Sequence, residues 1–153
     1  RPDGRLDCER RDGDGIGGVN AIYRGVAQGG YVLAQNSPTP KVILISSGSE
    51  VHIAHEAYQV LVNEGIAVRL VSLPCWALFD QQSAEYRDSV LPPDVTARVS
   101  IEAGVTHGWQ KYTGSRGITI GIDHFGASAP YQQIYQEFGL TAAKVIEAAK
   151  KLV

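Results

Sequence analysis

The sequence predicts an α/β fold whose parallel sheet is buried on both faces. The main evidence is the run KVILISSGSE at residues 41–50, in which four apolar residues precede a Ser/Gly turn. A helical pattern follows the turn, and after Gly65 a second apolar run covers residues 66–73. Strand, turn, helix and strand form a βαβ unit, which requires parallel strands. Ligands of such sheets bind beyond the carboxyl ends of the strands, so this turn is the first place to look for chemistry.

Turn signals divide the rest of the chain into strands and helices. A proline-rich turn ends a first short strand, and Gly65 ends the helix after the second strand. Pro130 suits the first position of a helix, and Thr141 suits the cap of the last helix. The predicted strands are residues 29–35, 42–45, 67–73, 96–102 and 117–122. Helices are predicted after residue 47, in short turns within residues 75–91, and at residues 106–112, 130–138 and 142–152.

Together these elements predict a three-layer α/β/α sandwich of about five strands, at least four of them parallel, with helices on both faces. We expect residues 21–153 to form this single domain. Residues 1–20 are rich in Arg, Asp and Gly and show neither helical nor strand periodicity. Such a segment buries too little apolar surface to offset its ordering entropy, so we expect a disordered tail or linker.

Composition limits the classes of function. The 153-residue chain is 44% hydrophobic and 20% charged, as is typical of a globular domain. Its net charge of −2 provides no basic surface for nucleic acid and no polybasic patch for a membrane. No apolar run approaches the roughly 20 residues that span a bilayer, and the charged start differs from a secretory signal. Cys8 and Cys75 lie in unlike settings, so we expect reduced thiols and a cytoplasmic location.

The turn after the second strand is the strongest candidate for a ligand site. Ser47, Gly48 and Ser49 open a helix directly after a strand, where backbone N–H groups favour anions. Ser128, in the loop after the last strand, is expected at the same edge of the sheet. The turn lacks the Lys of phosphate-binding loops, however, and Ser47 with Glu50 fits an S-x-x-E capping box. A structural interpretation is therefore favoured over an effector or anion pocket of Ser47, Gly48, Ser49 and Ser128.

Other candidate sites have weaker support. The letters G-x-G-x-x-G at residues 13–18 follow a charged stretch instead of a strand, so a dinucleotide site is not expected there. His52 and His55 have i, i+3 spacing but no further ligands to complete a metal site. Adjacent Asp123 and His124 do not readily form the hydrogen bond that a Ser/His/Asp site requires. We therefore expect no catalytic and no metal-binding residue in this chain.

Aromatic residues are concentrated in the connections between the predicted strands. In such positions they form an interface with another domain or subunit, or they cover the sheet of their own domain. The sequence favours neither interpretation over the other. The residues concerned are Trp76, Phe79, Tyr86, Trp109 and Tyr112.

Several segments together resemble the C-terminal domain of transketolase. They follow one another in the order of that family over residues 23–153, and their combination is specific although no single segment is decisive. The matching segments are GGYVLA at 29–34, ISSGSEV at 45–51, VRLVSLP at 68–74, FDQQSAEYRDSVLPPDVTARVSIEAG at 79–104, HGWQKY at 107–112, FGASAP at 125–130 and EFGLTAAKVIEAAKKL at 137–152.

The resemblance implies a five-stranded mixed sheet with four parallel strands and one antiparallel strand, at residues 29–35. It implies a parent enzyme that transfers a two-carbon ketol unit between sugar phosphates in the pentose phosphate pathway. The parent binds thiamine diphosphate and Mg²⁺ or Ca²⁺ through its first two domains, and this domain contributes no ligand to them. The chain alone is therefore expected to be inactive.

The same resemblance implies the partners of this chain, which are the other transketolase domains and a second subunit. Its own role is then structural, dimer-supporting or regulatory. The alternative is a stand-alone α/β module that binds phosphate or a nucleotide between the turns at residues 46–50 and 125–130.

Overall fold

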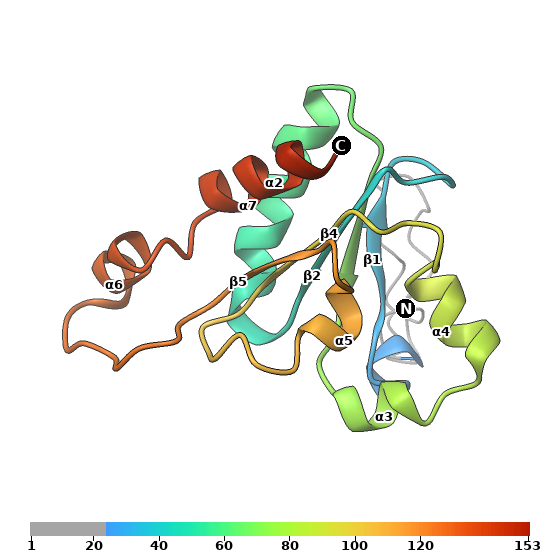
Figure 1. Ribbon diagram of the computed structural model, residues 1–153, viewed down its shortest axis with the longest axis horizontal. Coiled ribbons are helices and arrows are strands. Elements are labelled where there is room, and N and C mark those ends of the chain that lie inside the picture. The colour runs from blue at the N-terminus through green and yellow to red at the C-terminus, as the bar shows by residue number, and fades with distance from the viewer. Residues whose placement is uncertain (1–23) are drawn as a thin grey trace, which may run out of the picture.

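The computed structural model describes residues 24–153, and Figure 1 shows a central sheet between two groups of helices. The tail expected at residues 1–20, the glycine-rich letters at 13–18 and Cys8 lie outside the described residues. The strands are β1 Tyr31–Gln35, β2 Val42–Ser46, β3 Val68–Ser72, β4 Arg98–Ile101 and β5 Ile118–Ile120.

The sheet has the strand order β1-β3-β2-β4-β5. β1 runs antiparallel to β3, whereas β2 pairs in parallel with both β3 and β4, and β4 pairs in parallel with β5. The predicted mixed sheet with four parallel strands and one antiparallel strand is therefore confirmed. Because the parallel strands all point the same way, the turns that follow them meet at one edge of the sheet.

The apolar sequence of β2 is explained by burial on both faces of the sheet. Side chains alternate along a strand, so Val42 and Leu44 join one core cluster while Ile43 and Ile45 join the other. All four side chains are fully buried. The first cluster lies beneath α2 Val51–Asn63 and α7 Ala142–Leu152, which pack against each other and against the sheet.

The last helix begins where the sequence predicts. The hydroxyl of Thr141 accepts a hydrogen bond from the backbone N–H of Lys144, which is the expected N-cap contact. Near the other end of α7, Lys150 forms an ion pair of 2.6 Å with Glu64, just beyond α2. α7 is thus fixed against α2 at its C-terminal end.

The opposite face of the sheet is covered by three short helices, α3 Trp76–Asp80, α4 Ala84–Val90 and α5 Gln110–Thr113. Their aromatic side chains, with Trp109, pack into the second core cluster. The rings of Trp76 and Trp109 meet edge to face, with centroids 5.0 Å apart and planes at 85°. The aromatic residues therefore cover the sheet of their own domain. We call the following residues the aromatic cluster: Trp76, Phe79, Tyr86, Trp109 and Tyr112.

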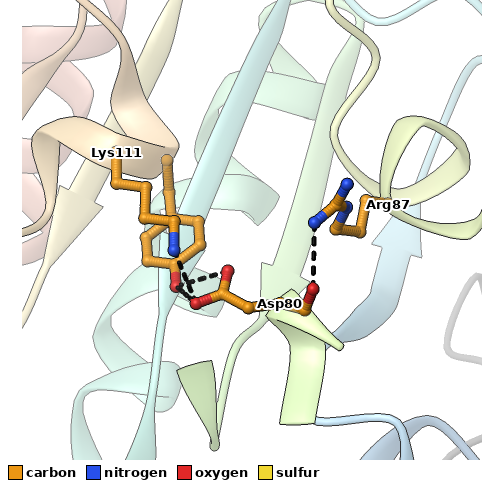
Figure 2. Close-up of polar contacts among 4 residues, drawn as sticks. Asp80, Arg87 and Lys111 are labelled. Carbon is orange, nitrogen blue, oxygen red and sulfur yellow. Dashed lines mark hydrogen bonds and ion pairs between the residues drawn. The ribbon is translucent and has the colours of Figure 1, made fainter. Parts of the chain in front are cut away.

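Asp80 joins three segments beside the aromatic cluster (Figure 2). Its carboxylate forms an ion pair with Lys111 at 2.6 Å and accepts a hydrogen bond from the Tyr112 hydroxyl at 3.2 Å. Its backbone carbonyl accepts a hydrogen bond from Arg87 Nη1 at 2.9 Å. Burial, together with the negative charge of Asp80, raises the pKa of Tyr112. The phenol therefore keeps its proton, and its hydrogen bond, throughout the neutral pH range.

α6 Tyr131–Glu137 stands apart from both helical layers, at the end of a long connection from β5 (Figure 1). Pro130 is its N-cap residue and not its first helical residue, which corrects the sequence prediction by one position. The reason is the backbone of Pro130, whose ψ of 136° is not helical. Within residues 24–153, no helix has the length and apolar character needed to cross a membrane.

Candidate functional site

The turn after β2 lies at the carboxyl edge of the sheet, where ligands of parallel sheets bind. It contains a short 3-10 helix, η1 Gly48–Glu50, and α2 follows directly. The predicted capping box is wrong, because neither Ser47 nor Glu50 makes a side-chain cap hydrogen bond. Both side chains turn to charged or hydroxyl partners from other parts of the chain. Ser47 thereby binds a carboxylate, and hydrogen bonds to a carboxylate are stronger than those between neutral groups.

Two glutamates dominate the electrostatics of this turn. Ser47 Oγ donates to Glu102 Oε2 at 2.6 Å, and Ser49 Oγ donates to Glu50 Oε1 at 2.8 Å. The Tyr135 hydroxyl donates to the same Glu50 oxygen. Glu50 is only 2% exposed. Burial raises the pKa of Glu102, the hydrogen bond from Ser47 partly offsets this effect, and the charge of Glu50 raises it further.

This arrangement opposes the binding of an anion. The hydroxyl protons of Ser47 and Ser49 are already donated to carboxylates, and a phosphate would add negative charge beside two acidic groups. Gly48 has a φ of +54° and leads the chain into η1. Ser128 lies in the exposed connection between β5 and α6. An effector or anion pocket at these four residues stays a prediction, and the geometry around the serines gives it no support.

The same residues do not fit the diphosphate group of a cofactor. Residues 46–50 contain no Lys or Arg that could neutralise it, and the carboxyl groups of Glu102 and Glu50 accept the hydrogen bonds of Ser47 and Ser49. In the part of the chain that the structure describes, no three His, Cys, Asp or Glu side chains are grouped to hold a metal ion. The residues of this turn therefore do not suit the diphosphate of thiamine diphosphate.

The two histidines of α2 have separate structural contacts. His52 is exposed, and its Nδ1 lies against the backbone carbonyl of Ser49. The His55 ring stacks against Tyr58, with centroids 6.1 Å apart and planes at 18°. Each histidine therefore has its own structural contact, His52 at the start of α2 and His55 along the side of the helix.

Asp123 and His124 also have separate partners. Asp123 accepts hydrogen bonds from the backbone N–H and the hydroxyl of Thr106, at 2.8 and 2.7 Å. These bonds lower the pKa of Asp123. The His124 ring packs edge to face against Phe138, with centroids 4.4 Å apart. The carboxylate thus anchors a loop, and it does not orient the histidine towards Ser128.

Two open clefts beside the edge strand β5 are features that the sequence analysis missed. One of about 370 Å³ lies between β5 and α7, and one of about 440 Å³ lies beside α5. Both are lined in part by Thr106, Thr119 and Asp123. Lys144 and Lys151 at the first cleft both pair with Glu147. The lining of the first cleft combines β5, α7 and the loops at residues 106 and 121–123, which are far apart in the sequence and so leave no local motif.

The raised pKa of Glu102 predicts a specific dependence of stability on pH. A group with a higher pKa in the folded state stabilises the fold below its unfolded value, here the ordinary 4.5, and this contribution is lost as pH rises through the folded pKa. Glu102→Gln keeps an oxygen that accepts from Ser47 but cannot ionise. We expect the melting temperature of Glu102→Gln, relative to wild type, to rise as the pH rises above 4.5 and to level off above the folded pKa of Glu102.

Thermal unfolding of both proteins over this pH range, monitored by circular dichroism, measures the effect. The exposed α2 residue Glu56 provides the control variant Glu56→Gln. A difference for Glu102→Gln that is constant with pH, or that falls as pH rises, would contradict the prediction.

Comparisons with known proteins agree on one family. A model of the transketolase-like C-terminal domain matches residues 29–141. The chloroplastic transketolase of Solanum tuberosum is 58% identical over 130 residues, which are 84% of this chain and 18% of the relative. The transketolase of Halalkalibacterium halodurans is 48% identical over 137 residues, 90% of this chain and 21% of the relative. The solved transketolase from Leishmania mexicana matches with a TM-score of 0.77 and 39% identity, over 84% of this chain and 18% of that one.

Two consequences follow from these matches. The chain spans only 18–21% of the length of the two curated relatives above. The cytoplasmic location expected from the sequence is contradicted, because the relatives from Solanum tuberosum, Spinacia oleracea and Arabidopsis thaliana, at 55–58% identity, are named chloroplastic. The error arose because an expectation of reduced thiols points to a reducing environment and cannot identify the compartment.

Proposed function

The chain belongs to the transketolase C-terminal domain family, and we propose that it is the third domain of a transketolase that works in a plastid. In this proposal the parent enzyme transfers a two-carbon ketol unit between sugar phosphates, and its first two domains bind thiamine diphosphate and Mg²⁺. The observation that carries the proposal is the 58% identity to the Solanum tuberosum enzyme over 130 residues. The chloroplastic names of that relative and of one from Craterostigma plantagineum support the compartment.

The domain itself has a structural role in this proposal. Its partners are the preceding domains of the same polypeptide and a second subunit. Support comes from the turn after β2, where the hydroxyls of Ser47 and Ser49 donate to carboxylates and residues 46–50 include no Lys or Arg to bind a phosphate. We also propose the domain boundaries predicted from the sequence, with the domain at residues 21–153.

A chimaera tests this proposal directly. Residues 29–153 of this chain replace the corresponding segment of Solanum tuberosum transketolase, and ketol transfer is measured with the cofactor present. We expect kcat/KM within about tenfold of the unmodified enzyme, a difference of about 1.4 kcal/mol in transition-state stabilisation. The 153-residue chain alone should show no ketol transfer. Turnover by the chain alone, or a folded chimaera without activity, would contradict the proposal.

Serine substitutions separate this role from a ligand-binding one. In the chimaera, Ser47→Ala, Ser49→Ala and Ser128→Ala should each leave kcat unchanged, whereas loss of a group that stabilises a transition state lowers it about 10²- to 10³-fold.

The alternative function, an anion-binding module, predicts that inorganic phosphate raises the melting temperature of the isolated chain. It also predicts that the triple serine variant loses this shift. The absence of any shift with the wild-type chain would exclude phosphate binding at these serines.

A further inference from the structure

Residues 123–137, here called the arm, leave the end of β5 and stand clear of the two helical layers (Figure 1). The arm runs extended to Pro130 and then forms α6. Residues 123–133 are all exposed, and α6 has no buried residue. Phe125 is 98% exposed and Tyr131 is 60% exposed. The arm thus places two aromatic side chains in solvent, and among its residues only Tyr135 packs against the core of its own domain.

The composition of the arm differs from that of a solvated surface. Residues 125–136, FGASAPYQQIYQ, contain no charged side chain. The exposed face of α7, by contrast, carries Lys144, Glu147 and Lys151 in ion pairs. Exposed apolar side chains that lie together mark interaction surfaces, and aromatic rings are common anchors of such surfaces. The arm therefore has the character of an interface segment.

Both ends of the arm are fixed to the domain. At its start, Asp123 accepts two hydrogen bonds from Thr106, at 2.8 and 2.7 Å. At its return, the Tyr135 hydroxyl donates to the buried Glu50, and Phe138 packs against the core cluster beneath α2 and α7. An arm held at both ends presents its exposed rings in a defined place, which reduces the entropy lost on binding.

We propose that the arm docks into an uncharged, apolar pocket in the part of the transketolase polypeptide that lies outside this domain, with Phe125 as the anchor. This inference rests on the proposed function. The matched region is only 18% of the Solanum tuberosum relative, so most of such a polypeptide is available to cover the arm. An uncharged pocket fits, because residues 125–136 offer no counter-charge to a buried ion. The glutamine side chains of α6 supply hydrogen bonds at the rim.

Hydroxyl-radical labelling measures the docking of the arm. The side-chain oxidation of Phe125 and Tyr131 is compared by mass spectrometry between the 153-residue chain and the chimaera described above. We expect oxidation of both rings to fall severalfold in the chimaera. Phe125→Asp in the chimaera should restore the oxidation of Tyr131, because it places a charge in the pocket. Val105, which is 63% exposed and lies outside the arm, provides the control Val105→Asp, which should leave Tyr131 protected.

Equal oxidation of both rings in the chain and in the chimaera would overturn the docking proposal. Protection that develops in the isolated chain as its concentration is raised would also overturn it, and would identify a second copy of this chain as the occupant. Ketol transfer by the same samples separates the two proposals. An active chimaera with an oxidised arm rejects the docking alone, and a folded, inactive chimaera with a protected arm rejects the proposed function alone.

Discussion

Replacing Phe79 by alanine should lower the free energy of unfolding of this chain by about 3–5 kcal/mol. The ring is 2% exposed and lies against Tyr86 and Tyr112, with centroid distances of 6.3 and 6.2 Å. The backbone of Gly30 closes another side, since a Cβ added there would lie 2.8 Å from Phe79 Cδ2. Tyr86 and Tyr112 are themselves held by hydrogen bonds to Gly30 and Asp80. The cavity left by alanine therefore cannot collapse easily, and the loss is a large share of the stability of a typical domain.

The neighbouring residue of α3 supplies a matched control. Leu78 is 41% exposed, so Leu78→Ala should cost less than about 1 kcal/mol. Both variants lie on the same short helix, and both replace an apolar side chain by alanine. Urea unfolding monitored by circular dichroism gives the two free energies. Similar losses for Phe79→Ala and Leu78→Ala would show that helix propensity matters here and burial in the aromatic cluster does not.

The fold could be predicted because its strongest signals are local. The continuous apolar run of β2 predicts a strand that is buried on both faces, and its side chains divide between the two core clusters accordingly. The positions of Gly65 and Thr141 predict the end of one helix and the start of another, and both are observed. The resemblance to the transketolase C-terminal domain is confirmed by the family match over residues 29–141.

The contacts at the turn after β2 could not be predicted, because their partners are distant in the sequence. Ser47 and Glu50 satisfy a capping-box pattern, which depends only on the spacing between them. In the structure Ser47 donates to Glu102, 55 residues away, and Glu50 accepts from Tyr135, 85 residues away. A local pattern contains no information on which side chains the fold brings beside it. The effector pocket proposed at this turn therefore still depends on experiment.

The aromatic residues illustrate the same limit in a different way. The sequence places Trp76 and Trp109 in connections, where an interface with a partner and a cover for the sheet are equally compatible with it. The structure brings the two rings together over the sheet, at a centroid distance of 5.0 Å. The exposed rings lie instead on the arm, at Phe125 and Tyr131. Composition identifies the residue types of an interface, but only the fold separates those that are already covered.

Arg98→Met should lower the free energy of unfolding by about 3 kcal/mol, because several backbone carbonyls lose their donor. Arg98 Nε donates to the Val95 carbonyl at 2.8 Å, and Nη1 donates to Tyr112 at 2.6 Å. Nη2 donates to Leu91 at 3.2 Å and to Pro92 at 2.8 Å. Burial lowers the pKa of Arg98, yet a guanidinium keeps its charge at neutral pH. Methionine has a similar length but no donor, so the loop before β4 and the end of α5 both lose their connection to the strand.

Two further variants separate these hydrogen bonds from side-chain packing. Arg98→Lys keeps the charge but offers a single ammonium in place of a planar fork, so it should recover only part of the loss. Arg116→Met removes an exposed arginine and should change stability by less than about 0.5 kcal/mol. Urea unfolding gives the three free energies, and hydrogen exchange of the Leu91, Asp94 and Val95 amides should accelerate in Arg98→Met. If Arg98→Met and Arg116→Met have the same free energy of unfolding, water satisfies the backbone carbonyls that Arg98 binds equally well. The guanidinium then does not hold the loop to β4.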